Sequence, residues 1–323
     1  MPTLNASGVT LSFQTTGRGP DVVLLHGLAA NQAFWLPTAL RLAERFRVTT
    51  FDLRGHGYSG MPTTGYTPWH MARDVVELMD RLGIQQSHLV GHSFGGVVAL
   101  GVALKHAPRV RSLTIADSRL RTLQPWQPLR EIPEWSRLAA AIRGAGVPID
   151  ADEPEIGVSL LEAFATRRWR ERFRRFVRED GFVPFAGKWG GGRSADRWLR
   201  LMRTTAARRE LRTPLFSSPD VLGELKLPVL ACYASRSPNL DTFHALSDRL
   251  DNCQSQIVPN AGHYFPLTNV EFLLEHWPRF VDSLPLRDDV PPALKCSAED
   301  AATCDPTSLE QAEALAERFV SAS

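Results

Sequence analysis

The stretch Ser87-His-Leu-Val-Gly-His-Ser-Phe-Gly-Gly-Val-Val-Ala-Leu-Gly-Val-Ala-Leu-Lys-His106 decides the fold of this chain. Its first part is an apolar run of strand length, and its second part, Phe94–His106, is apolar over the length of a helix. The junction, Gly91 to Gly95, matches the pattern G-x-S-x-G in the strand–turn–helix context that gives this pattern meaning. We therefore predict that Ser93 occupies a sharp turn at the sheet edge, and that Gly91 and Gly95 are small because their neighbours crowd the turn.

The sequence on both sides of this stretch alternates between strand-length and helix-length segments. Apolar runs predict strands at Val9–Phe13, Asp21–His26, Arg47–Asp52, His88–Gly91, Val110–Ala116, Pro228–Tyr233 and Gln256–Pro259, the first as a half-exposed edge strand. Helical periodicity predicts helices at Thr38–Arg45, Pro68–Leu82, Phe94–His106, Leu240–Leu250 and Val270–Leu284. This order predicts an α/β fold with a doubly wound, mostly parallel sheet.

The alternation stops between about Arg119 and Glu224, where Trp, Arg and Leu recur at helical spacing. We expect a helical cap inserted after the strand that ends at Asp117, above the carboxyl ends of the strands, where open α/β sheets bind ligands. The predicted organisation is a core in two parts (1–117 and 226–285), a cap (118–225), and a linker with a short tail helix (286–323).

The composition argues against a membrane-spanning, a secreted or a metal-binding protein. Charged residues make up 22% of the 323 residues, no apolar stretch reaches the length of a membrane span, and no leader pattern opens the chain, so we expect a cytoplasmic protein. The four cysteines have no metal-ligand spacing, and no metal or cofactor is expected. The net charge is +2, but residues 167–212 hold fifteen Lys and Arg against five Asp and Glu.

The chain resembles the α/β-hydrolase superfamily. The resemblance rests on four segments in that family's order, which are Leu25-His-Gly27, Asp52-Leu-Arg-Gly-His-Gly-Tyr-Ser59, Gly91-His-Ser-Phe-Gly-Gly96 and Ala261-Gly-His263. It covers about residues 5–284, is weak across the cap and is absent from the tail. It implies that Ser93 is a catalytic nucleophile, but it says nothing specific about the substrate.

A serine hydroxyl needs a general base within hydrogen-bond reach. Among nine histidines, His263 follows the last predicted strand, which places it on a loop at the carboxyl edge of the sheet. It also follows the serine in the chain order that the resemblance implies. We therefore predict that His263 is the base.

The acid that should orient His263 is missing from the position at which the resemblance implies it. The resemblance implies an Asp after the strand Pro228–Ala234, but Ser237 stands at that position. Asp117 ends the preceding strand, where some members of the family place the acid, and a buried carboxylate there needs a partner. We favour Asp117 as the acid and keep Asp241 as the alternative.

The resemblance implies an oxyanion hole formed by the backbone N–H groups of Leu28 and Phe94. His26 is expected to brace its own loop. Arg54 and His56, in the Gly-rich turn after the strand Arg47–Asp52, are likewise expected to brace the loops around the site and not to act in catalysis.

The resulting hypothesis is a serine hydrolase that cleaves a carboxylic ester of a small acyl substrate through an acyl-enzyme on Ser93. Two alternatives remain, namely a thioesterase or acyltransferase acting on CoA- or carrier-bound acyl chains, and a hydrolase-fold binding protein without activity. The basic segment 167–212 is either a solvated amphipathic part of the cap or a surface for an acidic acyl carrier protein. Nucleic acid is not expected as a partner, since no recognition motif accompanies the charge.

Overall fold

The computed structural model describes residues 1–125, 156–166 and 191–285. The chain forms two compact units, Met1–Trp277 and Pro278–Ser323, and the sheet and the candidate site lie in the first. The predicted linker and tail helix of 286–323 lie outside the described residues.

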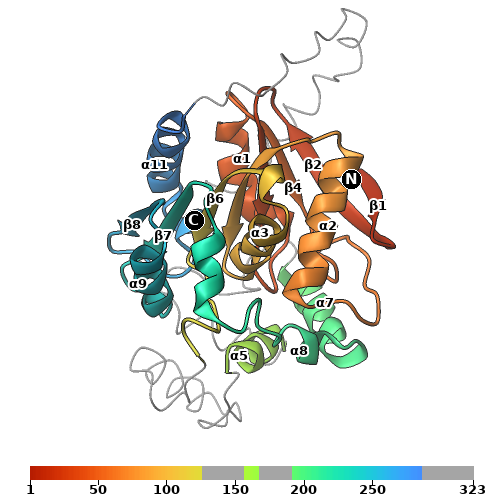
Figure 1. Ribbon diagram of the computed structural model, residues 1–323. Helices are drawn as coiled ribbons and strands as arrows, with labels where there is room; N and C mark the ends of the chain where they lie inside the picture. Colours follow the sequence, from red (N-terminus) through yellow and green to blue (C-terminus); the bar gives the residue numbers. More distant parts are fainter. Residues whose placement is uncertain (126–155, 167–190, 286–323) are drawn as a thin grey trace, which may run out of the picture. The chain divides into compact units, whose positions relative to one another are not determined.

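One sheet contains the eight strands of the described residues, in the order β1-β2-β4-β3-β5-β6-β7-β8 (Figure 1). The strands are β1 Thr3–Ala6, β2 Val9–Thr16, β3 Asp21–Leu25, β4 Arg47–Phe51, β5 Ser87–His92, β6 Val110–Ala116, β7 Val229–Ala234 and β8 Cys253–Val258. β2 pairs antiparallel with β1 and β4, and every other neighbouring pair is parallel. The predicted mostly parallel α/β fold is thus confirmed.

Helices and 3-10 turns alternate with these strands. They are η1 Gln32–Trp35, α1 Leu36–Leu42, α2 Pro68–Arg81, α3 Phe94–Lys105, η2 Ala107–Arg109, α5 Ile156–Ala165, α7 Gly191–Thr204, α8 Ala207–Glu210, η4 Pro219–Glu224, α9 Leu240–Arg249, α10 Phe265–Thr268 and α11 Val270–Asp282. α3 contacts β5 and β6 on one side and α2 on another, so its residues Gly95–Ala103 are all buried. Its sequence is therefore apolar all round.

One strand prediction is wrong in its place in the sheet. The segment from Val9 was expected to form an edge strand, but β2 lies between β1 and β4. The strand at this edge of the sheet is β1, which sequence reasoning missed because Thr3-Leu-Asn-Ala6 is short and contains no apolar run. β8 also begins at Cys253, three residues before the predicted start.

The described parts of the predicted cap, residues 118–125, 156–166 and 191–225, contain helices and no strand. α7 contacts α5 and α8, and Figure 1 shows the three gathered at one end of the sheet. The buried side chains of α7 are Ala195, Trp198, Leu201 and Met202, whereas Arg193, Arg200 and Arg203 are exposed. α7 is therefore amphipathic, with its apolar face in the core.

Hydrogen bonds tie this part of the insertion to the loop that follows β4. Arg197 donates through Nε to the Gly55 carbonyl at 3.1 Å and through Nη2 to the Ser59 carbonyl. The carboxylate of Glu210 accepts the N–H groups of Gly65 and Tyr66, each at 2.7 Å. Residues 126–155 and 167–190 of the predicted cap, which include the first part of the basic segment 167–212, lie outside the described residues.

Among the helices that the structure describes, none combines the length and the apolar character that a membrane crossing requires.

Candidate active site

Ser93 lies in the sharp turn between β5 and α3. Its φ of 54° and ψ of −123° are unusual for a residue with a side chain, and such backbone strain is often found at functional sites. A Cβ on Gly91 would come within 2.4 Å of the Gly95 carbonyl oxygen, and one on Gly95 within 2.3 Å of the Leu25 carbonyl oxygen. The two glycines are therefore required by crowding, as the sequence predicted.

The structure brings Ser93, His263 and Asp117 together from three loops at the carboxyl edge of the sheet. His263 Nε2 lies 3.2 Å from Ser93 Oγ, and His263 Nδ1 lies 2.8 Å from Asp117 Oδ1. These distances are within hydrogen-bond reach, so Nδ1–H donates to the carboxylate and Nε2 is left to accept the serine proton. The arrangement has the geometry of a nucleophile, a general base and an orienting acid.

Asp117 follows β6, which pairs with β7. Its N–H continues the ladder to the Cys232 carbonyl at 3.0 Å, and its φ of 51° turns the side chain out of the strand direction. The side chain is fully buried. The competing carboxylate, Asp241, is exposed in the first turn of α9. Within the described residues, the acid that contacts His263 is Asp117.

The environment of Asp117 favours the ionised carboxylate. Burial by itself raises the pKa, but hydrogen bonds from His263, Ser237 and the Ala234 N–H lower it further than burial raises it. The pKa of Asp117 is therefore below its ordinary value. Ser237 stands where the sequence lacked the expected Asp, and sequence reasoning missed that it donates to the acid. The polar character of the loop after β7, the strand that pairs with β6, was the sequence signal that could have indicated this role of Ser237.

Leu28 and Phe94, the predicted oxyanion donors, directly follow Gly27 and Ser93 in the chain. Phe94 is the first residue of α3, where a helical N–H has no intrahelical acceptor. Gly27 approaches Ser93 so closely that a Cβ on it would lie 2.9 Å from Ser93 Cβ. In the described part of the chain, neither N–H donates to a protein acceptor. Leu28 and Phe94 therefore remain the predicted donors for a substrate oxygen.

His26 braces the loop that carries Leu28. Its Nε2 accepts the Leu53 N–H at 3.1 Å, and its Nδ1–H donates to the Gly27 carbonyl at 2.7 Å. Burial lowers the pKa of His26 to about 4, so the ring is neutral at pH 7 and these two hydrogen bonds persist. The bracing role predicted for His26 agrees with these contacts.

Arg54 forms a buried bidentate ion pair with Asp74 of α2, with Nε–Oδ2 and Nη2–Oδ1 distances of 2.6 and 2.5 Å. The Arg54 carbonyl accepts Nδ1–H of His56 at 3.0 Å. Both residues thus hold the turn after β4, and neither forms a hydrogen bond with Ser93 or His263.

His92, which precedes Ser93 in the chain, holds the backbone of His263. Its Nε2–H donates to the His263 carbonyl at 2.8 Å, and its ring stacks on Phe34. Burial lowers the pKa of His92 to about 3, so it is neutral at pH 7 and remains a donor through Nε2. Sequence reasoning gave this residue no role, although it belongs to the G-x-S-x-G segment.

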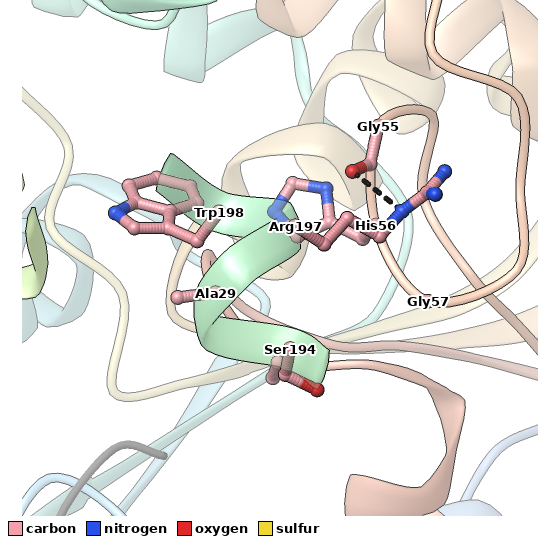
Figure 2. A pocket seen from close by; sticks show the side chains of 8 residues that line it. Ala29, Gly55, His56, Gly57, Ser194, Arg197 and Trp198 are labelled. Atoms are coloured by element: carbon pink, nitrogen blue, oxygen red, sulfur yellow. Dashed lines mark hydrogen bonds between the residues drawn. The ribbon is translucent and has the colours of Figure 1, made fainter. Parts of the chain in front are cut away.

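A pocket lies between α7 and the loops after β3 and β4 (Figure 2). Its lining comprises Ala29, Ala30, Gly55, His56, Gly57, Ser194, Arg197 and Trp198. Figure 2 shows the polar ends of Ser194, Arg197 and Trp198 pointing away from one another, and the Arg197 head reaches toward the Gly55 carbonyl. Because Ser93, His263 and Asp117 are not part of the lining, this pocket adjoins the loop of Leu28 without containing the candidate nucleophile.

No group of three or more His, Cys, Asp or Glu side chains suited to a metal ion occurs in the described ranges.

Comparisons with known proteins agree with this architecture. The family described as "alpha/beta hydrolase fold" matches residues 20–142. A 2-(acetamidomethylene)succinate hydrolase of Mesorhizobium japonicum is 27% identical over 85% of this chain and 92% of its own length. The 3-oxoadipate enol-lactonase 1 of Acinetobacter baylyi is 34% identical, but over only 42% of this chain and 52% of its own length.

A solved structure is similar to this chain in fold over most of its length. The carboxylesterase CesB from Bacillus subtilis has a TM-score of 0.65 over 88% of this chain and 91% of its own, at 16% identity. Such a low identity shows a common fold and nothing about the substrate.

Proposed function

Since the chain belongs to the α/β-hydrolase superfamily and its named relatives are hydrolases, we propose that it is a serine hydrolase that cleaves a carboxylic ester through an acyl-enzyme on Ser93. The observation that carries the proposal is the hydrogen-bonded chain from Ser93 through His263 to Asp117. Ester cleavage needs a nucleophile, a proton carrier and donors for a developing oxyanion, and these residues can supply all three.

In the first half-reaction, Ser93 Oγ attacks the ester carbonyl carbon while His263 Nε2 removes the serine proton. The carbonyl oxygen becomes an oxyanion, which accepts hydrogen bonds from the N–H groups of Leu28 and Phe94. Each such donor is worth about 2.7–4 kcal/mol of transition-state stabilisation. His263 then protonates the leaving alcohol, and the acyl group remains on Ser93.

In the second half-reaction, His263 removes a proton from a water molecule, which attacks the acyl carbon. The tetrahedral intermediate collapses, the proton returns to Ser93 Oγ, and the carboxylic acid leaves. In both halves, Asp117 accepts Nδ1–H of His263, which holds the ring in the required tautomer and stabilises the imidazolium.

A fluorophosphonate probe tests the proposal directly. It phosphonylates an activated serine, so the wild-type protein is expected to carry one adduct on the peptide that contains Ser93, as measured by mass spectrometry. The protein denatured before the reaction is the control, because unfolding separates Ser93 from His263. If the folded wild-type protein remains unlabelled, the proposal is wrong and the binding-protein alternative stands.

A second candidate is a thioesterase or acyltransferase that acts on carrier-bound acyl chains. Exposed Arg193, Arg200 and Arg203 on α7 favour it, because a positive helix face attracts an acidic partner or a phosphate group. The rest of the basic segment, 167–190, lies outside the described residues. Comparing aryl esters with acyl-CoA and acyl-carrier substrates at low and raised salt separates the two candidates: a carrier preference that weakens with salt supports the second.

A further inference from the structure

The loop that follows β7, residues 235–239, surrounds the carboxylate of Asp117. Ser237 Oγ–H donates to Asp117 Oδ1 at 2.5 Å, and Asn239 Nδ2–H donates to the same oxygen at 2.9 Å. The Ala234 N–H donates to Oδ2 at 3.0 Å. The distance from Ser237 is typical of a hydroxyl that donates to a charged carboxylate. With Nδ1–H of His263, the carboxylate therefore accepts four hydrogen bonds.

The donors are held in place by the loop itself. Ser237 Oγ accepts the Asn239 N–H at 2.9 Å, so its own proton is left to point at Asp117. The Asn239 amide also donates to the Asp117 backbone carbonyl at 3.1 Å. Both side chains are almost completely buried, with 5% of Ser237 and 6% of Asn239 exposed. Water is therefore a poor substitute for either donor.

Asn239 also lies beside the base. Its Nδ2 is 3.4 Å from His263 Nδ1, and both nitrogens donate to the same carboxylate oxygen. The two donors thus share Oδ1, and a change in one alters the strength of the other. The loop after β7 can in this way act on the base through the acid.

We propose that Ser237 and Asn239 are positioning residues that keep buried Asp117 ionised and aimed at His263, and so set the pH range in which His263 works as a base. The proposal rests on the proposed serine hydrolase function. The positioning role also explains why the acid can follow β6 instead of β7. The loop after β7 has Ser237 in place of an Asp, but it supplies the hydrogen bonds that a buried carboxylate on the neighbouring strand requires.

The other titratable groups that face this pair from β5, β7 and the His263 loop are neutral near pH 7. Burial lowers the pKa of His92 to about 3 and raises the pKa of Cys232, Tyr233 and Tyr264. They do not change charge between pH 5 and 9, so a shift of the activity profile in that range reports on Asp117 and His263 together.

Ser237→Ala removes one hydrogen bond to the carboxylate. A hydrogen bond to a charged group is worth a factor of about 10–100, so we expect kcat on an aryl ester to fall about tenfold or more at pH 7, with KM changed less than twofold. Without this donor the pKa of Asp117 rises, and the pair formed by Asp117 and His263 keeps the proton that they share up to a higher pH. The acidic limb of the pH profile of kcat/KM is therefore expected to move to higher pH by about half a unit or more.

Ser118→Ala is the matched control, because Ser118 is equally buried, adjoins Asp117 in the chain and has no hydrogen-bond partner for its hydroxyl within the described residues. Ser237→Thr keeps the hydroxyl and is expected to recover most of the loss. Asn239→Leu removes the second donor and is expected to move the acidic limb in the same direction as Ser237→Ala. Rates are normalised to the sites titrated by the fluorophosphonate, so that unfolded protein does not count.

A second readout does not depend on turnover. A proton shared between His263 Nδ1 and a carboxylate gives a low-field proton resonance, and its pH dependence is expected to shift upward in Ser237→Ala but not in Ser118→Ala. The proposal is overturned if the profile and the resonance of Ser237→Ala both match those of Ser118→Ala. The two proposals can also fail separately. If the protein neither cleaves esters nor reacts with the probe, but the resonance of Ser237→Ala still shifts, the proposed hydrolase function is refuted and the positioning role of Ser237 stands.

Discussion

Replacing Ser93 with alanine is expected to lower kcat on a simple aryl ester by about 10⁵- to 10⁶-fold, the size of loss found when a serine hydrolase loses its nucleophile. The physical reason is that no other nucleophile is hydrogen-bonded to His263 Nε2 in the described residues. Any activity that remains comes from water acting beside the oxyanion donors. The measurement is single-turnover and steady-state kinetics of the purified variant, with fluorophosphonate labelling as a parallel readout.

The fold should not change in this variant, because Ser93 makes no other side-chain hydrogen bond in the described part of the chain. The backbone of the turn, in which φ of Ser93 is 54°, is held by hydrogen bonds that do not involve the hydroxyl: the Ser93 N–H donates to the Ala116 carbonyl at 2.9 Å, and the Gly96 N–H donates to the Ser93 carbonyl at 3.0 Å. Circular dichroism and a melting temperature close to the wild-type value are the control. A Ser93→Ala protein that retains a tenth of the wild-type rate would refute the assignment of the nucleophile.

Replacing Asp117 with asparagine is expected to lower kcat/KM about 10³- to 10⁴-fold. An amide is nearly the same size as a carboxylate, but it carries no charge to stabilise the imidazolium, and it favours the wrong tautomer when its NH₂ group faces Nδ1. The four donors around the carboxylate would lose their charged acceptor as well. The measurement is kcat/KM between pH 6 and 9, on protein whose folding is checked by thermal unfolding.

Asp241→Asn is the paired control, because Asp241 is the acid that sequence reasoning kept as the alternative. Its side chain is exposed in the first turn of α9, where a negative charge contributes about 0.3–1 kcal/mol to helix stability and nothing to the base. We expect its kcat/KM to stay within twofold of wild type. The reverse outcome, a loss confined to Asp241→Asn, would show that the acid is not Asp117.

The sequence predicted the core elements well where the physical signal is local. The turn at Ser93 was predictable because the spacing of Gly91 and Gly95 leaves few other conformations between a buried strand and an apolar helix. The edge strand β1 was not, because four residues with one large apolar side chain carry no periodicity, and their pairing with β2 depends on a non-local partner.

In the candidate site, too, local sequence signals were predictive, whereas contacts between distant parts of the chain were not. Ser93 and His263 could be selected from their motif, chain order and position after strands, all of which are readable along the chain. The sequence favoured Asp117 over Asp241 but did not decide between them, because the choice depends on which of two neighbouring strands brings its carboxylate to His263. That choice is decided by the parallel pairing of β6 with β7, which sets Ala116 opposite Cys232 and brings the loop after β7 over the Asp117 side chain.

The sequence by itself thus determined the α/β fold and the candidate nucleophile and base, because these follow from local periodicity and from a turn that only a few residue types permit. Only the tertiary structure decided which carboxylate contacts the base and what Ser237 and Asn239 contact. Those contacts join residues more than a hundred positions apart, and a buried carboxylate is tolerable only where such distant donors converge on it.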